Sequence, residues 1–146
     1  MTDIFRDEPG PGRDPEPGAS GLRVMIVSDA IASRNGVGSY YADLVGHLKD
    51  HVANAELVSP GSDTADCAHE LTFPLPGDRT QRVYIPRAAR IWERVKAVSP
   101  DVAVVPTPGP YGVLGFFIAR CRGIPLCAGY HTRYEKLTDL YWAGAL

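Results

Sequence analysis

The chain of 146 residues is poor in cysteine, has no long apolar run and carries no excess of charge of one sign. Its three cysteines, Cys67, Cys121 and Cys127, are odd in number and form no C-x-x-C pair, which argues against a disulfide framework and a zinc cluster. We therefore expect free thiols. The longest apolar stretch, residues 113–119, is far shorter than the roughly 20 residues of a membrane-spanning helix, so no such helix is expected.

The amino-terminal segment also lacks the pattern of a secretory signal, because its start is acidic and no apolar run follows. We expect a cytoplasmic protein. Residues 1–20 contain four prolines and three glycines, a composition that buries too little apolar surface to fold, and they are predicted to be a disordered acidic tail. The formal net charge is −2, and without a basic excess the composition predicts no nucleic-acid partner.

Residues 21–146 alternate between strand-like and helix-like patterns. The continuous apolar run LRVMIVS, residues 22–28, is typical of a parallel strand buried on both faces. Apolar residues from Val37 to Leu48 recur at helical spacing and predict a helix with one apolar face. A short second strand is expected at residues 55–59.

The second half of the chain repeats this alternation. Residues 62–81 are rich in proline, glycine and aspartate and are expected to be mostly loop, with an edge strand at 69–73 and a strand-like piece at 83–85. The later elements are a helix, a strand, a helix and a buried strand, over residues 86–99, 101–106, 110–123 and 125–130. The order predicts an α/β fold, a Rossmann-like parallel sheet with helices on both faces.

The end of the chain has an apolar pattern with no later segment to cover it. Residues 135–146 are predicted to be helical, with Leu137, Leu140, Tyr141 and Trp142 on one face. We therefore expect residues 21–146 to form a domain that is incomplete at its C-terminal end, and we expect it to self-associate or to pack against a missing domain.

Three loops follow predicted strands, where ligands bind in open parallel sheets. The first, residues 29–38, places Gly36 and Gly38 before a helix N-terminus, whose free N–H groups attract phosphate. Tyr41 stands where the dinucleotide fingerprint has its third glycine, so that fingerprint is not complete. The alternative is a glycine turn that only begins the helix.

The second loop, PTPGPYG, places Thr107, Pro108 and Gly109 directly after a buried strand. These residues predict a rigid wall that a ligand can approach closely, or else a plain helix start with a proline in its first turn.

The third loop places His131 after another strand, where its imidazole could hydrogen-bond a substrate hydroxyl or transfer a proton. Thr132 and Tyr134 add hydroxyls, and Arg133 could pair with an anionic group. The alternatives are a core or surface histidine and a solvated arginine.

Two other patterns have weaker functional interpretations. His47 and His51 are four residues apart on the first helix, but no acid of the H-E-x-x-H type accompanies them, and no metal site is predicted. The basic residues Arg87, Arg90 and Arg94, the arginine stripe, lie opposite the apolar face of their helix. They indicate a solvated face or, alternatively, peripheral contact with an anionic membrane.

Two longer segments combine these loops in a pattern that resembles a known family. Residues 23–48 (RVMIVSDAIASRNGVGSYYADLVGHL) contain a strand, the glycine loop and a helix, and residues 100–137 contain T-P-G-P after one strand and Y-H-T after another. Together they resemble the N-terminal, acceptor-side domain of GT-B fold glycosyltransferases of family 4. That group includes lipid mannosyl-, glucosyl- and sulfoquinovosyltransferases.

The resemblance implies transfer of a sugar from a nucleotide-sugar donor to a sugar or lipid acceptor with retention of configuration, without metal or cofactor. It implies that Gly36 and Gly38 line the donor phosphates and the transferred sugar, and that His131 contacts the sugar or acceptor. It also implies a location at the inner face of the membrane for members with lipid acceptors. The second, donor-binding domain of the family has no counterpart in this sequence.

Two other functions remain open from the residues alone: an inactive Rossmann-like binding module, and an unrelated nucleotide-binding domain. A nucleotide-binding Rossmann domain would have an acidic ribose-binding residue after its second strand. Ser59, Pro60 and Gly61 stand there instead, which disfavours that reading.

Overall fold

A computed structural model describes residues 21–32, 34–61, 69–75, 78–129 and 131. The predicted acidic tail, Cys67 and the predicted terminal helix lie outside these residues. Cys121 and Cys127 are free and exposed, as expected. No helix in the described part of the chain is both long and apolar enough to cross a membrane.

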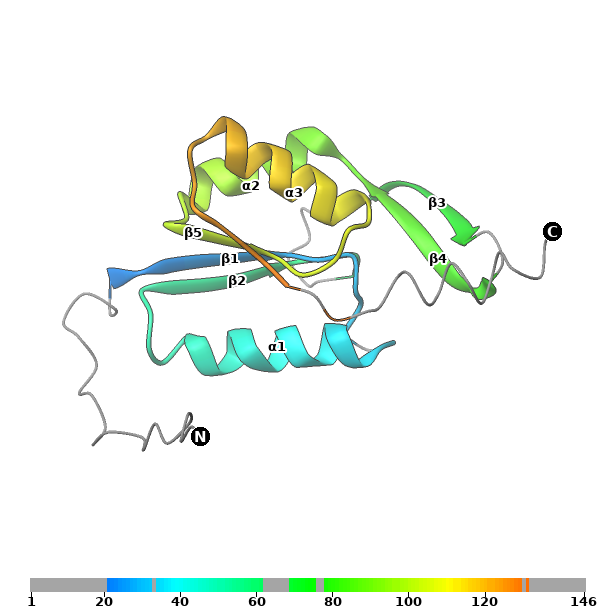
Figure 1. Ribbon diagram of the computed structural model, residues 1–146, viewed down its shortest axis with the longest axis horizontal. Helices are drawn as coiled ribbons and strands as arrows, with labels where there is room; N and C mark the ends of the chain where they lie inside the picture. Colours follow the sequence, from blue (N-terminus) through cyan, green and yellow to red (C-terminus); the bar gives the residue numbers. More distant parts are fainter. Residues whose placement is uncertain (1–20, 33, 62–68, 76–77, 130, 132–146) are drawn as a thin grey trace, which may run out of the picture.

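The centre of the fold is a parallel sheet of four strands (Figure 1). Strand β1 (Arg23–Val27) lies between β2 (Asn54–Val58) and β5 (Val102–Val105), and β6 (Leu126–Ala128) pairs with β5. The order β2-β1-β5-β6 places the first strand inside the sheet, because β2 pairs on one side of β1 and β5 pairs on the other. The strands are parallel because a connection that contains a helix leads to each new strand.

Helices cover both faces of this sheet (Figure 1). Helix α1 (Gly36–Leu48) lies on one face, and α2 (Ala88–Val98) and α3 (Pro110–Cys121) lie on the other. The predicted α/β fold, a Rossmann-like parallel sheet with helices on both faces, is therefore confirmed.

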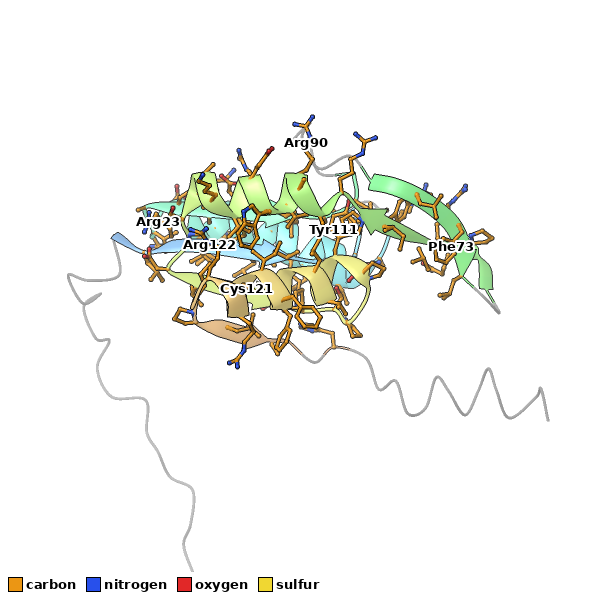
Figure 2. All side chains as sticks on the ribbon, turned by 90° about the horizontal axis from the view of Figure 1, so that it is seen from above. Arg23, Phe73, Arg90, Tyr111, Cys121 and Arg122 are labelled. Carbon is orange, nitrogen blue, oxygen red and sulfur yellow. The ribbon has the colours of Figure 1, made fainter. Side chains whose placement is uncertain are left out.

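Strand β1 is buried on both sides because its side chains alternate between two cores. Met25 and Val27 pack with Ile91, Val95 and Tyr111 beneath α2 and α3, where Tyr111 is fully buried (Figure 2). Val24 and Ile26 point to the opposite face and pack with Tyr41 and Val45 of α1. The unbroken apolar run of the sequence thus serves two cores at once.

A two-stranded antiparallel hairpin corrects the prediction for residues 62–81. Strand β3 (His69–Leu75) pairs with β4 (Asp78–Pro86), so the edge strand expected at 69–73 is present, but the other described residues through 81, at 74–75 and 78–81, are strand and not loop. Register shifts between His69 and Leu71 and between Pro74 and Leu75 interrupt the alternation of apolar and polar residues by which a strand is recognised in a sequence. The hairpin projects beyond the carboxyl ends of β1 and β2 (Figure 1).

Strand β6 is also different from its prediction. Residues 125–130 were expected to be a buried strand, yet Cys127 and Ala128 are exposed and only three residues, Leu126–Ala128, are strand. The reason is its position at the edge of the sheet, where only β5 pairs with it among the described strands.

Candidate functional site

Asp29 follows β1 and joins that strand to the start of α3. Its carboxylate accepts hydrogen bonds from the backbone N–H groups of Tyr111 (2.7 Å) and Gly112 (3.1 Å), in the first turn of the helix. Helix α3 has no side-chain cap of its own, since its N-cap residue is Gly109. Asp29 therefore caps α3 from a segment about 80 positions earlier in the chain.

Thr107 completes this link. Its hydroxyl accepts a hydrogen bond from the backbone N–H of Asp29 (2.8 Å) and donates one to the Asp29 carboxylate (2.8 Å). Burial raises the pKa of Asp29 above its ordinary value, although hydrogen bonds from Thr107, Tyr111, Gly112 and the Gly109 backbone act in the opposite direction. The T-P-G-P loop is thus fixed to the end of β1.

Two glycines allow this close arrangement. A Cβ on Gly109 would lie 2.5 Å from the carboxyl carbon of Asp29. A Cβ on Gly112 would collide with the carbonyl oxygen of Thr107. Side chains at these positions would push α3 away from the loop, so the glycines of the T-P-G-P-Y-G segment are needed for packing.

Helix α1 begins at the same edge of the sheet. The Asn35 side chain is its N-cap and accepts a hydrogen bond from the backbone N–H of Gly38 (2.7 Å). A Cβ on Gly38 would collide with the backbone of Ile31, whereas a Cβ on Gly36 would meet nothing within 4 Å. Packing therefore explains the glycine at 38 and leaves the glycine at 36 without a steric reason.

His131 lies against the second turn of α1. Its Nε2 is 2.6 Å from the hydroxyl of Tyr41, a residue of α1 that is only 5% exposed. The two rings meet edge to face, and Tyr40 adds a third ring. One ring nitrogen is thereby committed to Tyr41.

The ends of β1 and β5, the start of α1 and the hairpin border an open cavity of about 560 Å³. We call it the polar cavity. Its wall combines the ends of β1 and β5, the start of α1 and the hairpin; the lining residues are Asp29, Ala30, Asn35, Val37, Leu75, Gln81, Arg82, Thr107, Pro108 and Gly109. The volume falls in the range of small-molecule sites.

A second cavity of about 550 Å³ lies on the other side of the T-P-G-P loop. It shares Thr107 and Pro108 with the polar cavity, but the rest of its wall is apolar and comes from β5, α3 and the segment after β6. Exposed side chains of α3, including Phe116 and Phe117, form part of it. The loop therefore separates a cavity with both polar and apolar groups in its wall from one that is almost wholly apolar.

The structure brings together only some of the residues that the sequence singled out. Thr107, Pro108 and Gly109 line the polar cavity, whereas Gly36, Gly38 and His131 are not among its lining residues, although Asn35 and Val37 are. Thr132, Arg133 and Tyr134 lie outside the described residues.

Sequence reasoning missed Asp29, Asn35, Tyr41 and Arg82 as functional candidates. An asparagine directly before a predicted helix is an N-cap signal and could have been read. The partners of Asp29 and Tyr41, at Thr107 and His131, are about 80 and 90 positions away in the chain. No local pattern could reveal them.

The arginine stripe is only partly available to a ligand or surface. Arg94 forms a salt bridge with Glu56 of β2 at 2.7 Å, so its charge is already paired. Arg87 and Arg90 are exposed, and Figure 2 shows Arg90 at the outer side of α2. Among the described residues no group of three His, Cys, Asp or Glu side chains is placed to hold a metal ion.

Comparison with known proteins adds one finding. The family model described as Glycosyltransferase Family 4 matches residues 34–145, more than half of the chain. The matched region begins just before α1 and includes the hairpin, the T-P-G-P loop and His131. No curated protein and no solved structure matches the chain.

Proposed function

The chain belongs to Glycosyltransferase Family 4, and on that premise we propose that it forms the acceptor-side half of a site for sugar transfer. In this proposal a nucleotide sugar is the donor, a sugar or lipid is the acceptor, and the configuration of the transferred sugar is retained. The nucleotide is held mainly by a second, donor-binding domain.

The observation that carries the proposal is the polar cavity at the carboxyl edge of the parallel sheet. The loops after β1 and β5, the start of α1 and the hairpin contribute to its wall. Ligands of open α/β sheets bind at this edge, since loops that follow different strands converge there. A family-4 sequence and a cavity at this edge together favour a substrate site.

The residues of the proposed site come from three segments of the chain. Thr107, Pro108 and Gly109 form a wall that Asp29 holds in place, and this wall borders the substrate. Gly36 lies where a bound phosphate or sugar would approach the start of α1, and within the described part of the chain no atom lies within 4 Å of a Cβ added there. Thr132, Arg133 and Tyr134 supply further substrate contacts.

His131 contacts the sugar or the acceptor through Nδ1. Tyr41 fixes the ring through Nε2, so the imidazole is held in one orientation before substrate binds. A ring that is already oriented can hydrogen-bond a sugar hydroxyl or carry a proton without reorganising in the transition state.

Peripheral contact with an anionic membrane is part of the proposal for a lipid acceptor. Arg87, Arg90 and Lys96 of α2 are exposed and would supply attraction of about 1 kcal/mol per basic residue. Co-sedimentation with vesicles should require anionic lipid and decrease with salt. Equal binding to neutral vesicles would contradict the role of these residues.

Sugar transfer itself tests the proposal. The chain alone should give no turnover with nucleotide hexoses, because stabilisation of the leaving nucleotide comes from the donor-binding domain. When the chain is joined to the donor-binding domain of a family-4 enzyme, transfer should occur. His131→Ala should lower kcat by roughly 100-fold.

Two glycine variants of the joined protein separate function from folding. Gly36→Ala should reduce kcat/KM without loss of stability, since a Cβ there meets no protein atom. Gly46→Ala, on the same helix and equally open, is the matched control and should leave transfer unchanged. No transfer by the joined, folded protein with any nucleotide hexose would contradict the proposed function.

A further inference from the structure

Two charged side chains line the polar cavity, Asp29 from the end of β1 and Arg82 from β4 of the hairpin. A cavity lined by one acid and one base would at first suit a neutral ligand. Whether the Asp29 carboxylate is available to a ligand depends on the hydrogen bonds that it already accepts.

Most of the hydrogen-bonding capacity of the Asp29 carboxylate is used within the protein. An ionised carboxylate offers about four acceptor sites. The Thr107 hydroxyl and the N–H groups of Tyr111 and Gly112 use three of them. Its charge also faces the positive end of the α3 dipole. Asp29 is therefore part of the wall and does not act as a ligand for substrate hydroxyls.

The other polar groups of the cavity are mainly donors. The Asn35 carbonyl oxygen already accepts the Gly38 N–H, so its amide group presents two N–H donors and no open acceptor on the capped side. The Arg82 guanidinium carries five N–H donors and a permanent positive charge. Gln81, the neighbour of Arg82, contributes an amide that can donate as well.

We propose that the polar cavity binds a phosphate group of a substrate, with Arg82 of the hairpin as its charged partner and the Asn35 amide as a second donor. A planar guanidinium matches the oxygens of a phosphate in bidentate geometry. Asp29, the one acid among the described lining residues, is hydrogen-bonded to the start of α3. The hairpin thereby becomes an element of substrate specificity, because it supplies the charge that the sheet edge itself does not.

This inference rests on the proposed function for one point, that the phosphate belongs to a substrate of sugar transfer. Two sources carry that chemistry: the diphosphate of the donor and the phosphorylated headgroup of an acceptor. Binding of phosphate in the cavity does not itself require transfer, so the two proposals can fail separately.

The test is calorimetric titration of the 146-residue chain with inorganic phosphate. Arg82→Gln should weaken binding by about 10-fold or more, the usual effect of losing a charge-assisted hydrogen bond. Arg120→Gln, in the last turn of α3 and outside the polar cavity, is the matched control and should bind phosphate like the parent chain.

A second variant keeps the proposal testable if the hairpin variant does not fold. Asn35→Asp preserves the cap of α1, because aspartate is an equally good N-cap, but replaces the two donors by negative charge. It should also weaken phosphate binding by 10-fold or more. Parallel titrations with sn-glycerol 3-phosphate and uridine diphosphate then distinguish the sources, since the tighter ligand identifies the acceptor or the donor.

Equal binding of phosphate by the parent chain and a folded Arg82→Gln variant would overturn the inference. So would an equal loss in Arg120→Gln, which would indicate general surface attraction. Phosphate binding that depends on Arg82, combined with no transfer by the joined protein, would retain this site and reject the proposed function. Transfer that does not depend on Arg82 would retain the function and reject the site.

Discussion

At the scale of single residues, Asp29 is the side chain on which the site depends most. It follows the central strand, accepts the N–H groups at the start of α3 and shares two hydrogen bonds with Thr107. A helix end that is capped by a residue from a distant strand fixes the loop between them as well. One carboxylate thus positions the wall of the polar cavity.

We expect Asp29→Asn to destabilise the fold. The amide would place N–H donors where the carboxylate now accepts, leaving a buried backbone N–H or hydroxyl without a partner. The free energy of unfolding in urea should decrease by about 1–3 kcal/mol. Asp43→Asn, at an exposed position of α1, is the control and should change it by less than about 0.5 kcal/mol.

The ion pair between Arg23 and Asp101 predicts that the fold loses stability at acid pH. Arg23 binds the Asp101 carboxylate through its side chain, at 2.9 and 3.0 Å, and through its backbone N–H. These hydrogen bonds lower the pKa of Asp101 from 3.8 to about 2. Because the unfolded chain takes up the proton first, the stability from this pair is complete above pH 3.8 and is lost as the pH falls toward 2.

Arg23→Gln should therefore return the pKa of Asp101 toward 3.8, which carbon NMR of the carboxyl group would measure. The opposite result, an Asp101 pKa that stays near 2 in the variant, would show that Arg23 is not the cause. Asp29 serves as an internal reference, since its pKa is raised by burial and does not depend on Arg23.

At the scale of elements, helix α1 is held against the loop that precedes it by one glycine. Gly38→Ala should cost about 1–3 kcal/mol of unfolding free energy, because the added methyl group collides with the backbone of Ile31. Gly46→Ala on the same helix should instead add up to about 1 kcal/mol, since nothing lies within 4 Å and alanine favours the helix. Equal effects of the two changes in urea unfolding would contradict this packing.

The sequence predicted those elements whose residues have a regular environment. Strand β1 is apolar after Arg23 because both of its faces are buried, and α1 and α2 each bury one stripe, so period and burial agree. The hairpin lies outside the main sheet and has irregular register, and its proline and aspartate residues look like loop. Its strands follow from pairing with each other, which composition does not encode.

In the candidate site, too, some features follow from the local sequence and others do not. The wall at Thr107–Gly109 was predicted, because a proline- and glycine-rich loop directly after a buried strand is a local pattern. The contacts of Asp29 with Thr107 and of Tyr41 with His131 join distant parts of the chain and depend on the order of strands in the sheet. That order cannot be read from the spacing of residues.

At the scale of the whole molecule, one side of the described fold is apolar and open. The face of α3 next to the edge strand β6 carries Val113, Phe116 and Phe117, which are 47%, 40% and 59% exposed. Among the described strands, β6 pairs only with β5. Large apolar side chains gathered beside the edge strand of a sheet are typical of a surface that another segment or chain covers.

We expect the chain to pair with a second copy through this face. Sedimentation velocity should show association that increases with concentration. Phe116→Glu combined with Phe117→Glu should reduce it, because charge placed in an apolar contact must be desolvated. Phe73→Glu, an exposed apolar position on the hairpin (Figure 2), is the control and should leave association unchanged. A parent chain that remains monomeric at high concentration would contradict the expectation.

We propose that the carboxyl edge of the sheet, and the polar cavity within it, is the substrate site of a family-4 glycosyltransferase domain. Amide NMR mapping of the chain with a nucleotide sugar tests this proposal. We predict weak binding, with shifts concentrated at Asn35, Val37, Arg82, Thr107 and Gly109 and lost in Arg82→Gln. Shifts confined to other surfaces, such as α2 or the apolar face of α3, would contradict it.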